Sequence, residues 1–245
     1  MRKEIATMKI ALVGYGKMGK SIEEIAVARG HEVILKIDRT TLANFTKENI
    51  DAADVVIEFT GPESAYQNVS KCINFSAAVV CGSTGWTEQL EEVKQLCIEK
   101  KTALLYASNF SIGVNIFFEL NKKLASLMNA QNDYDVQIVE THHTQKKDSP
   151  SGTAITIAEQ ILENVTRKKE WINSISENPK QLEIISERID AVAGTHTVTY
   201  SSPIDEIEIT HTAHSRMGFA LGAVLAAEFL IGKTGCFTMK NVLQF

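Results

Sequence analysis

Residues 140–154, ETHHTQKKDSPSGTA, gather side chains suited to proton transfer on an anion. His142 and His143 are adjacent, and Lys146 and Lys147 follow shortly after them. A histidine exchanges protons near neutral pH because its reference pKa is about 6.5, whereas a lysine keeps a full positive charge. The tract therefore predicts a site where a small acidic molecule lies beside proton donors.

A helix is expected to begin directly after this cationic run. Ser151 is a good N-cap residue, and Gly152 and Thr153 open the apolar-periodic segment 152–169. The first turn of a helix presents unpaired N–H groups and the positive end of the helix dipole. This helix start predicts a carboxylate-binding site next to the charge of Lys146.

The adjacent histidines do not predict a metal site. If residues 135–143 form a strand, the side chains of His142 and His143 point to opposite faces and cannot readily bind one ion. No zinc or other metal is therefore expected. Glu140 lies on the same face as His142 and could orient its ring.

A second candidate site is the sequence VGYGKMGKSIEEI near the N-terminus. Gly14, Gly16 and Gly19 form the pattern G-x-G-x-x-G between a predicted strand and a predicted helix, where backbone can approach a pyrophosphate. Asp38 ends the next predicted strand, at the position that accepts hydrogen bonds from an adenosine ribose. The alternative is a glycine turn that only packs the helix onto the sheet.

The residues around Asp38 leave the form of the dinucleotide open. Asp38 favours the free 2′-hydroxyl of NADH, whereas Arg39, with Lys17 as an extra cation, could hold the 2′-phosphate of NADPH. Arg39 could also be a solvated surface charge. The expected cofactor is therefore NADH or NADPH, without a choice between them.

The first hundred residues alternate between strand-like and helix-like patterns. Strands are expected at 8–15, 32–38, 54–60, 77–83 and 103–108, with helical segments between them. This rhythm predicts an α/β fold with a Rossmann-like, doubly wound parallel sheet. Three of the strands end in small or amide-bearing residues, FTGP at 59–62, GSTG at 82–85 and ASNF at 107–110, which would form a floor for the cofactor.

The pattern changes after about residue 113. A long helix at 111–129, a strand at 133–144 and the helix after Ser151 precede three strands without helices between them, at 181–189, 194–202 and 205–213. These elements predict a second α+β domain with a mixed open sheet. The chain is expected to end on the apolar helix 218–232.

The composition argues against several classes of protein. The net charge of −5 gives no general attraction to nucleic acid or to an anionic membrane. The four cysteines form no C-x-x-C pair, no apolar run reaches transmembrane length, and the start does not read as a signal peptide. A reduced, cytoplasmic protein is expected.

The tract E-x-HH-x-x-K-x-D-x-PSGTA resembles the signature of the dihydrodipicolinate reductase family, also called 4-hydroxy-tetrahydrodipicolinate reductase. GYGKMG, EFTGPES, CGSTGWTEQ, ASNFSIGVN and IEITHTAHSRMGFALGAV resemble other segments of that family, so the resemblance covers nearly the whole chain. It implies an oxidoreductase that reduces 4-hydroxy-tetrahydrodipicolinate with NADH or NADPH, in the diaminopimelate route of lysine biosynthesis. It also implies a homotetramer.

The resemblance assigns roles to individual positions. His142 and Lys146 correspond to proton donors, and which of them delivers the decisive proton is left open. The positions that correspond to dicarboxylate binding are His143, Ser151, Gly152 and Thr153. The implied cofactor contacts are Gly14, Tyr15, Gly16, Lys17, Met18, Gly19, Asp38, Arg39, Phe59, Thr60, Gly82, Ser83, Thr84, Ala107, Ser108, Asn109 and Phe110.

The resemblance also implies the division of the chain. Residues 1–113 and 217–245 would form the dinucleotide-binding domain, and 114–216 the substrate-binding and oligomerisation domain. Two alternatives have other functions. Another nicotinamide-dependent dehydrogenase with the same plan would not need the PSGTA helix start, and an inactive NAD(P)-binding sensor could lose His142 and Lys146.

Overall fold

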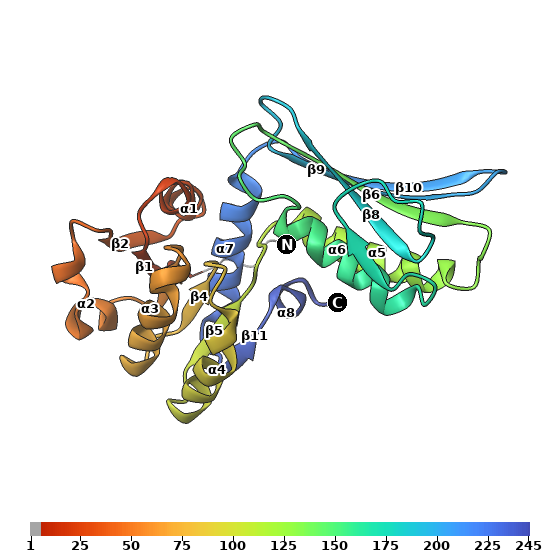
Figure 1. The fold of residues 1–245 in the computed structure, drawn as a ribbon. Coiled ribbons are helices and arrows are strands. Elements are labelled where there is room, and N and C mark those ends of the chain that lie inside the picture. The colour runs from red at the N-terminus through yellow and green to blue at the C-terminus, as the bar shows by residue number, and fades with distance from the viewer. Residues whose placement is uncertain (1–5) are drawn as a thin grey trace. The chain divides into compact units, whose positions relative to one another are not determined.

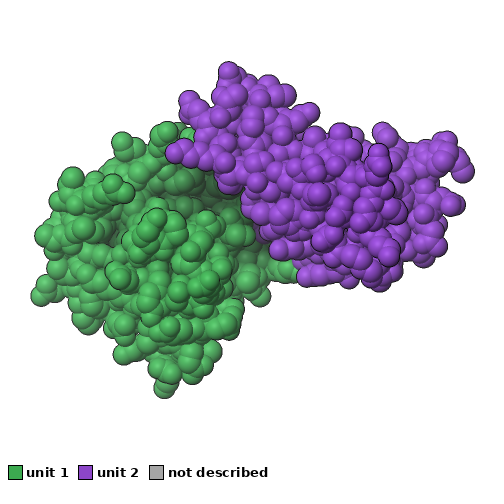
Figure 2. All heavy atoms as spheres, in the orientation of Figure 1, with its two compact units in different colours: residues 1–112, 216–245 green, residues 113–215 purple. Residues whose placement is uncertain are grey.

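The computed structural model describes residues 6–245, which form two compact units (Figure 2). Unit 1 contains the chain up to residue 112 together with residues 216–245, and unit 2 contains residues 113–215. Among the described residues, none of the helices combines the length and the apolar character needed to cross a bilayer.

Unit 1 is built on a six-stranded sheet in the order β11-β5-β4-β3-β1-β2 (Figure 1). All of its recorded pairings are parallel. Because β2 and β3 lie on opposite sides of β1, the carboxyl end of β1 is the point where the strand order reverses, which is where α/β sheets bind ligands. The strands are β1 (Lys9–Val13), β2 (Glu32–Ile37), β3 (Val55–Glu58), β4 (Val79–Cys81), β5 (Ala103–Tyr106) and β11 (Gly235–Phe237).

Helices cover both faces of this sheet, as the alternating pattern predicted. Ile10 and Leu12 of β1 pack in a core with residues of α1 and α7, whereas Ala11 and Val13 pack in a core with residues of α2, α3 and α4. This two-sided burial explains why these strands read as continuous apolar runs. The helices are α1 (Lys17–Ala28), α2 (Lys47–Asp51), α3 (Pro62–Asn74), α4 (Leu90–Glu99), α7 (Met217–Leu230) and α8 (Met239–Leu243), with 3-10 turns at Leu42–Asn44 and Thr87–Gln89.

The expectation that the chain ends on the apolar helix is wrong. After α7, β11 joins the edge of the sheet parallel to β5, and α8 follows it. The strand has only three residues and begins at a glycine, so it carries too little periodicity to be recognised from sequence.

Unit 2 contains the mixed sheet that the sequence predicted, and it has five strands in the order β10-β9-β6-β8-β7. β8 runs parallel to β6 and β7, while β9 runs antiparallel to β6 and β10. Two helices, α5 (Ile112–Met128) and α6 (Gly152–Asn164), share one apolar core with the sheet. The strands are β6 (Asp135–His142), β7 (Glu170–Ile172), β8 (Gln181–Arg188), β9 (Gly194–Ser201) and β10 (Glu206–Ala213); the three-residue β7 was not predicted.

The buried residues of strand β6 change from apolar to polar along its length. Its buried row consists of Val136, Ile138, Glu140 and His142. The first two residues belong to the apolar core, and the last two are polar. One strand therefore anchors the site in the core and delivers its ionisable side chains.

Close packing of α7 gives a prediction about stability. A Cβ atom at Gly222 would lie 1.7 Å from the carbonyl oxygen of Phe110, so backbone would have to move. Gly222→Ala should lower the free energy of unfolding by about 1–3 kcal/mol in urea titrations, although alanine is the better helix former. Gly218→Ala in the same helix is the control, because its nearest atom would be 3.8 Å away, in ordinary contact. Equal free energies of unfolding for Gly222→Ala and Gly218→Ala would contradict the close contact between Gly222 and Phe110.

Candidate active site

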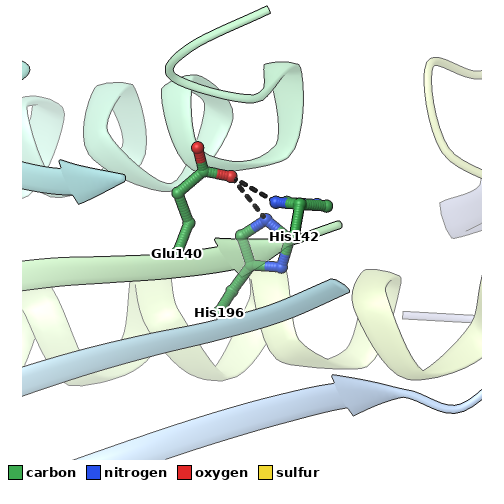
Figure 3. A group of neighbouring side chains, drawn as sticks. All are labelled: Glu140, His142 and His196. Carbon is green, nitrogen blue, oxygen red and sulfur yellow. Dashed lines mark ion pairs between the residues drawn. The ribbon is translucent and has the colours of Figure 1, made fainter. Parts of the chain in front are cut away.

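Glu140 and His142 form a buried pair at the end of β6 (Figure 3). Nδ1 of His142 lies 2.6 Å from Oε2 of Glu140, which is completely buried. Because a carboxylate only accepts hydrogen bonds, this contact favours a proton on Nδ1 and leaves Nε2 for proton exchange. Nε2 lies beside Gly194, where a Cβ atom would come within 3.0 Å of it.

The other oxygen of Glu140 holds two further elements. Oε1 accepts hydrogen bonds from the backbone N–H of Ser151 at 3.2 Å and from Nη2 of Arg188 at 3.1 Å. Arg188 also donates to the carbonyl oxygen of Asp148 at 2.8 Å. Burial alone would raise the pKa of Glu140, but the contacts from His142 and Ser151 outweigh it and hold that pKa below its usual range.

His196 is a member of this cluster that the sequence analysis missed. It pairs across the sheet with Glu140, and its Nε2 lies 3.0 Å from Oγ of Ser151 and 4.0 Å from Oε2 of Glu140. Burial, with the nearby charge of His142, lowers the pKa of His196 to about 3. The ring is therefore neutral at physiological pH. Its signal in the sequence was a histidine in the buried phase of an alternating strand, GTHTVTY.

The geometry of the cluster fits proton pairing better than metal binding. Within the described residues, Glu140, His142 and His196 are the group whose ligand atoms lie close enough to suggest an ion, all within 4.8 Å of one another. Two ligand atoms bonded to one zinc at 2.0–2.2 Å lie roughly 3.3 Å apart. The separation of 2.6 Å between His142 and Glu140 is too short for that arrangement.

Lys146 lies in the loop after β6, and its side chain is turned inward. The backbone N–H of Lys146 donates to the carbonyl oxygen of His143 at 3.0 Å. Its ammonium group contacts both carboxylate oxygens of Asp148 at 2.9 Å. The side chain of Lys146 is 21% exposed, whereas Lys147 is exposed. Of the two lysines, Lys146 is therefore the partly buried one, and it is held by Asp148.

At the start of α6, one residue stabilises the fold through its hydrogen bonds and the next is open to a ligand. Ser151 is the N-cap, as predicted, and its hydroxyl accepts from the N–H of Ala154 at 3.1 Å. That hydroxyl also contacts His196, and Ser151 is buried. Gly152 is exposed, and a Cβ atom there would meet nothing within 4 Å. The open part of the helix start is therefore Gly152, with Thr153 next to it.

The glycine turn of unit 1 has the shape that a dinucleotide requires. Gly14 has a φ of +101°, and a Cβ atom there would lie 2.0 Å from the carbonyl oxygen of Phe59. A Cβ atom at Gly19 would lie 2.3 Å from the carbonyl oxygen of Gly14. Gly16, in contrast, faces open space with nothing within 4 Å. The first and third glycines serve close packing, and the second leaves room for a bound group.

The residues after β2 are the acid Asp38 and the exposed cation Arg39, while a second exposed cation, Lys17, opens α1. Oδ1 of Asp38 accepts hydrogen bonds from the backbone N–H groups of Thr40 at 2.8 Å and Thr41 at 3.1 Å, and from both hydroxyls. These bonds, from Thr40 first, hold the pKa of Asp38 below its usual range. Arg39 and Lys17 are both exposed. Asp38 is thus charged at neutral pH and is held by the hydrogen bonds of its turn.

Tyr15 is held in place by two charged neighbours. Its hydroxyl donates to Glu23, which pairs with Lys36 at 2.5 Å, and the ammonium group of Lys36 lies 5.0 Å from the centre of the Tyr15 ring. Met18, in the first turn of α1, packs against the core that lies between α1 and the sheet.

The loops after β1, β3, β4 and β5 meet at the carboxyl edge of the sheet. The Phe59 and Phe110 rings lie 5.6 Å apart, and a Cβ atom at Gly82 would lie 2.1 Å from the Phe59 ring. The N–H of Thr60 donates to the hydroxyl of Ser83 at 2.8 Å. The remaining residues predicted for the cofactor, Thr84, Ala107, Ser108 and Asn109, lie in the loops that follow β4 and β5.

Comparison with known proteins assigns the chain to a family. The family model described as "Dihydrodipicolinate reductase, N-terminus" matches residues 8–110, and the one described as "Dihydrodipicolinate reductase, C-terminus" matches residues 113–243. The chain belongs to the dihydrodipicolinate reductase family.

Individual members of the dihydrodipicolinate reductase family match over nearly the whole chain. A 4-hydroxy-tetrahydrodipicolinate reductase from Christiangramia forsetii is 51% identical over 238 residues, which cover 97% of this chain and 98% of the relative. One from Thermosipho africanus is 36% identical over 239 residues, with the same coverage of both chains. A dipicolinate-bound dihydrodipicolinate reductase from Paenisporosarcina sp. TG-14 shares the fold, with a TM-score of 0.75 and 23% identity over 95% of this chain and 97% of that one.

The open space at Gly16 predicts a binding defect without a folding defect. Gly16 has a φ of −86°, which any residue can adopt. Gly16→Ala should leave the melting temperature within about 2 °C of the wild type and weaken NADH binding at least about tenfold, because the methyl group occupies the space above the turn. Calorimetry measures the melting temperature, and fluorescence titration measures the affinity for NADH. Gly14→Ala, which is strained, should lose both stability and binding; tight NADH binding by Gly16→Ala would contradict the assignment.

The buried neutral ring of His196 predicts how stability depends on pH. Between about pH 6.5 and pH 3 the unfolded chain binds a proton at His196 that the folded chain does not, so the free energy of unfolding falls as the pH falls. His196→Gln should reduce this dependence by about 1 kcal/mol per unit between pH 6 and pH 5, in urea titrations.

His214→Gln is the control for this experiment, because His214 is exposed. His211, whose burial lowers its pKa, contributes in the same direction and remains in both variants. An unchanged pH dependence in His196→Gln would contradict a neutral, buried ring.

Proposed function

We propose that this protein reduces 4-hydroxy-tetrahydrodipicolinate to tetrahydrodipicolinate with NADH or NADPH, in the diaminopimelate route of lysine biosynthesis. Membership of the reductase family over both halves of the chain supports the reaction. The observation that carries the proposal is the buried Glu140–His142 pair, which contacts the start of α6 at Ser151, where the next residue, Gly152, is open. Acid–base chemistry on a dicarboxylate requires this combination of groups.

Unit 2 would bind the two carboxylates of the substrate. The start of α6 at the exposed Gly152, with the half-buried Thr153 next to it, would offer one anion site, and His143 and the ammonium group of Lys146 would add polar contacts. Lys146 now pairs with the exposed carboxylate of Asp148. A solvent-exposed ion pair contributes little free energy, so a bound carboxylate can replace Asp148 at small cost.

His142 and Lys146 would move the protons of the reaction. The contact with Glu140 fixes the ring of His142, so that Nε2 can accept a proton and return it. Lys146 supplies a second N–H donor on the same loop. A positioned general acid typically accelerates a reaction by about 10²–10⁴-fold. When bound, the nicotinamide group supplies the hydride.

Unit 1 would bind the dinucleotide. The space above Gly16, the fixed carboxylate of Asp38 and the loops that meet at Phe59 fit a pyrophosphate, a ribose and a flat ring respectively. Arg39 and Lys17 lie exposed near the ribose position, where they can accept a 2′-phosphate. The protein would therefore use both NADH and NADPH.

The assembly and location follow from the same proposal. We place the protein in the cytoplasm as a homotetramer built on the sheet of unit 2. The apolar core of that sheet with α5 and α6 lies on one of its faces, and half-exposed residues such as Val139 and Ile185 line the alternate row. A sheet with one such face is suited to pairing with another copy.

A coupled assay tests the function. The preceding enzyme of the pathway generates the substrate in the cuvette, and the loss of nicotinamide absorbance is followed with NADH and with NADPH. Oxidation should require both the preceding enzyme and this protein. If neither cofactor is oxidised in a substrate-dependent manner, the proposal is wrong.

Replacing Lys146 separates chemistry from binding. Lys146→Ala should lower kcat by about 10²-fold or more, because a proton donor is lost. NADH affinity and melting temperature should stay near wild-type values, since the Asp148 carboxylate that pairs with Lys146 is exposed to solvent. Lys147→Ala removes the same charge from the exposed neighbouring position and should keep kcat within about threefold. Wild-type turnover in Lys146→Ala would exclude the role of this lysine.

A further inference from the structure

A buried glutamate lies at the carboxyl end of β3, outside the groups that the proposed reaction uses. Glu58 is the last residue of β3 and has no exposed surface. It pairs with Val13 of β1 on one side and with Cys81 of β4 on the other. Burying a glutamate in the middle of a parallel sheet is costly unless its oxygens are paired.

The partners of Glu58 are all hydrogen-bond donors. Oε1 accepts from the backbone N–H of Thr60 at 3.1 Å and from the Thr60 hydroxyl, and Oε2 accepts from the thiol of Cys81 at 3.1 Å. The Thr60 hydroxyl itself accepts from Ser64 at 2.9 Å and from Asn68 at 3.2 Å, so its single proton points to Glu58. Each of these partners can donate to it, so the hydrogen-bond pattern fits the carboxylate form of Glu58, which carries a negative charge.

Two features stabilise this charge without neutralising it. The helix α3 begins at Pro62, and Thr60 and Ser64 join the carboxylate to its first turn, where the helix dipole is positive. Burial, with the charge of Glu58, raises the pKa of Cys81, which keeps the thiol protonated as a donor. Among the described residues, no lysine, arginine or histidine forms an ion pair with Glu58. The negative charge is therefore not cancelled locally.

Glu58 lies directly beneath the loops assigned to the nicotinamide. Its carbonyl oxygen accepts from the N–H of Gly82 at 3.0 Å, and the N–H of Thr60 bridges its carboxylate and Ser83. Phe59, the next residue, donates to the carbonyl oxygen of Val13 at 2.8 Å. A charge in this buried position acts through a medium of low dielectric, so its effect extends to a ligand on the loops.

We propose that the Glu58 carboxylate stabilises the oxidised, positively charged nicotinamide relative to the reduced, neutral one, and so promotes hydride transfer. The proposal rests on the proposed binding of the cofactor to the loops after β3 and β4. In the reaction, a hydrogen leaves the reduced ring with both electrons of its bond and joins the substrate carbon. The ring gains one positive charge, while Glu58 exchanges no proton and acts by its field alone.

Glu58→Gln separates this electrostatic role from a purely structural one. Glutamine keeps the size of the side chain and removes the charge. The ratio of Kd for NAD⁺ to Kd for NADH should rise roughly tenfold, the effect of one unit charge about 10 Å away at an effective dielectric of about 20. If Glu58 only holds the loops, both Kd values rise by the same factor and the ratio stays constant, which would overturn the proposal.

Two further variants control for shape and for general charge. Glu58→Asp keeps the charge, so the ratio should stay within about twofold of the wild type even if both affinities fall. Glu63→Gln removes one negative charge from the exposed first turn of α3, where solvent screens it, and should leave the ratio unchanged. A shift in Glu63→Gln as large as that in Glu58→Gln would also overturn the proposal.

The outcomes distinguish this inference from the proposed function. If the wild type binds neither NADH nor NADPH, the proposed function fails. If the wild type binds the cofactor but Glu58→Gln leaves the ratio of Kd for NAD⁺ to Kd for NADH unchanged, only the proposed role of Glu58 is wrong. Should that variant not fold, carbon NMR of wild-type protein labelled at the glutamate carboxyl carbons decides, with Glu58→Asp providing the assignment. A protonated Glu58 at pH 7 would then overturn the proposal, and an ionised one would support it.

Discussion

The structure of unit 2 depends on one constraint, which is that the fully buried carboxylate of Glu140 must be paired on every side. Its oxygens contact the ring of His142, the first amide of the α6 start at Ser151 and the guanidinium group of Arg188. A lone buried charge would cost several kcal/mol, so these three groups are held in one arrangement. The strands β6 and β8 and the start of α6 are thereby joined around one carboxylate.

The two units accommodate a buried glutamate in different ways. Glu58 and Glu140 are both buried glutamates near the carboxyl end of a strand. Glu140 is paired with ionisable groups, which suits proton movement at His142. Glu58 is paired with neutral donors from Thr60 and Cys81, which leaves its charge uncancelled. In the proposed function, the first arrangement would orient a proton donor, and the second would provide an electric field at the cofactor.

Periodicity and local chemistry explain which features could be predicted. The period of two placed Glu140 and His142 on one face, and the N-cap chemistry of Ser151 fixed the start of α6. The strands β7 and β11 were missed because three residues carry no measurable period. Arg188 and His196 were missed because their partner lies 48 and 56 residues away in the chain, and no local pattern encodes that pairing.

The sequence by itself determined the alternation of elements, the glycine turn at Gly14 and the cationic tract around Lys146, because each depends on interactions between residues close in the chain. The tertiary structure decided that β9 lies beside β6, which brings His196 to Glu140, and that β4 lies beside β3, which brings Cys81 to Glu58. Strand order and register are set by the burial of whole apolar faces. The partners of a buried charge are therefore known only once the sheets are assembled.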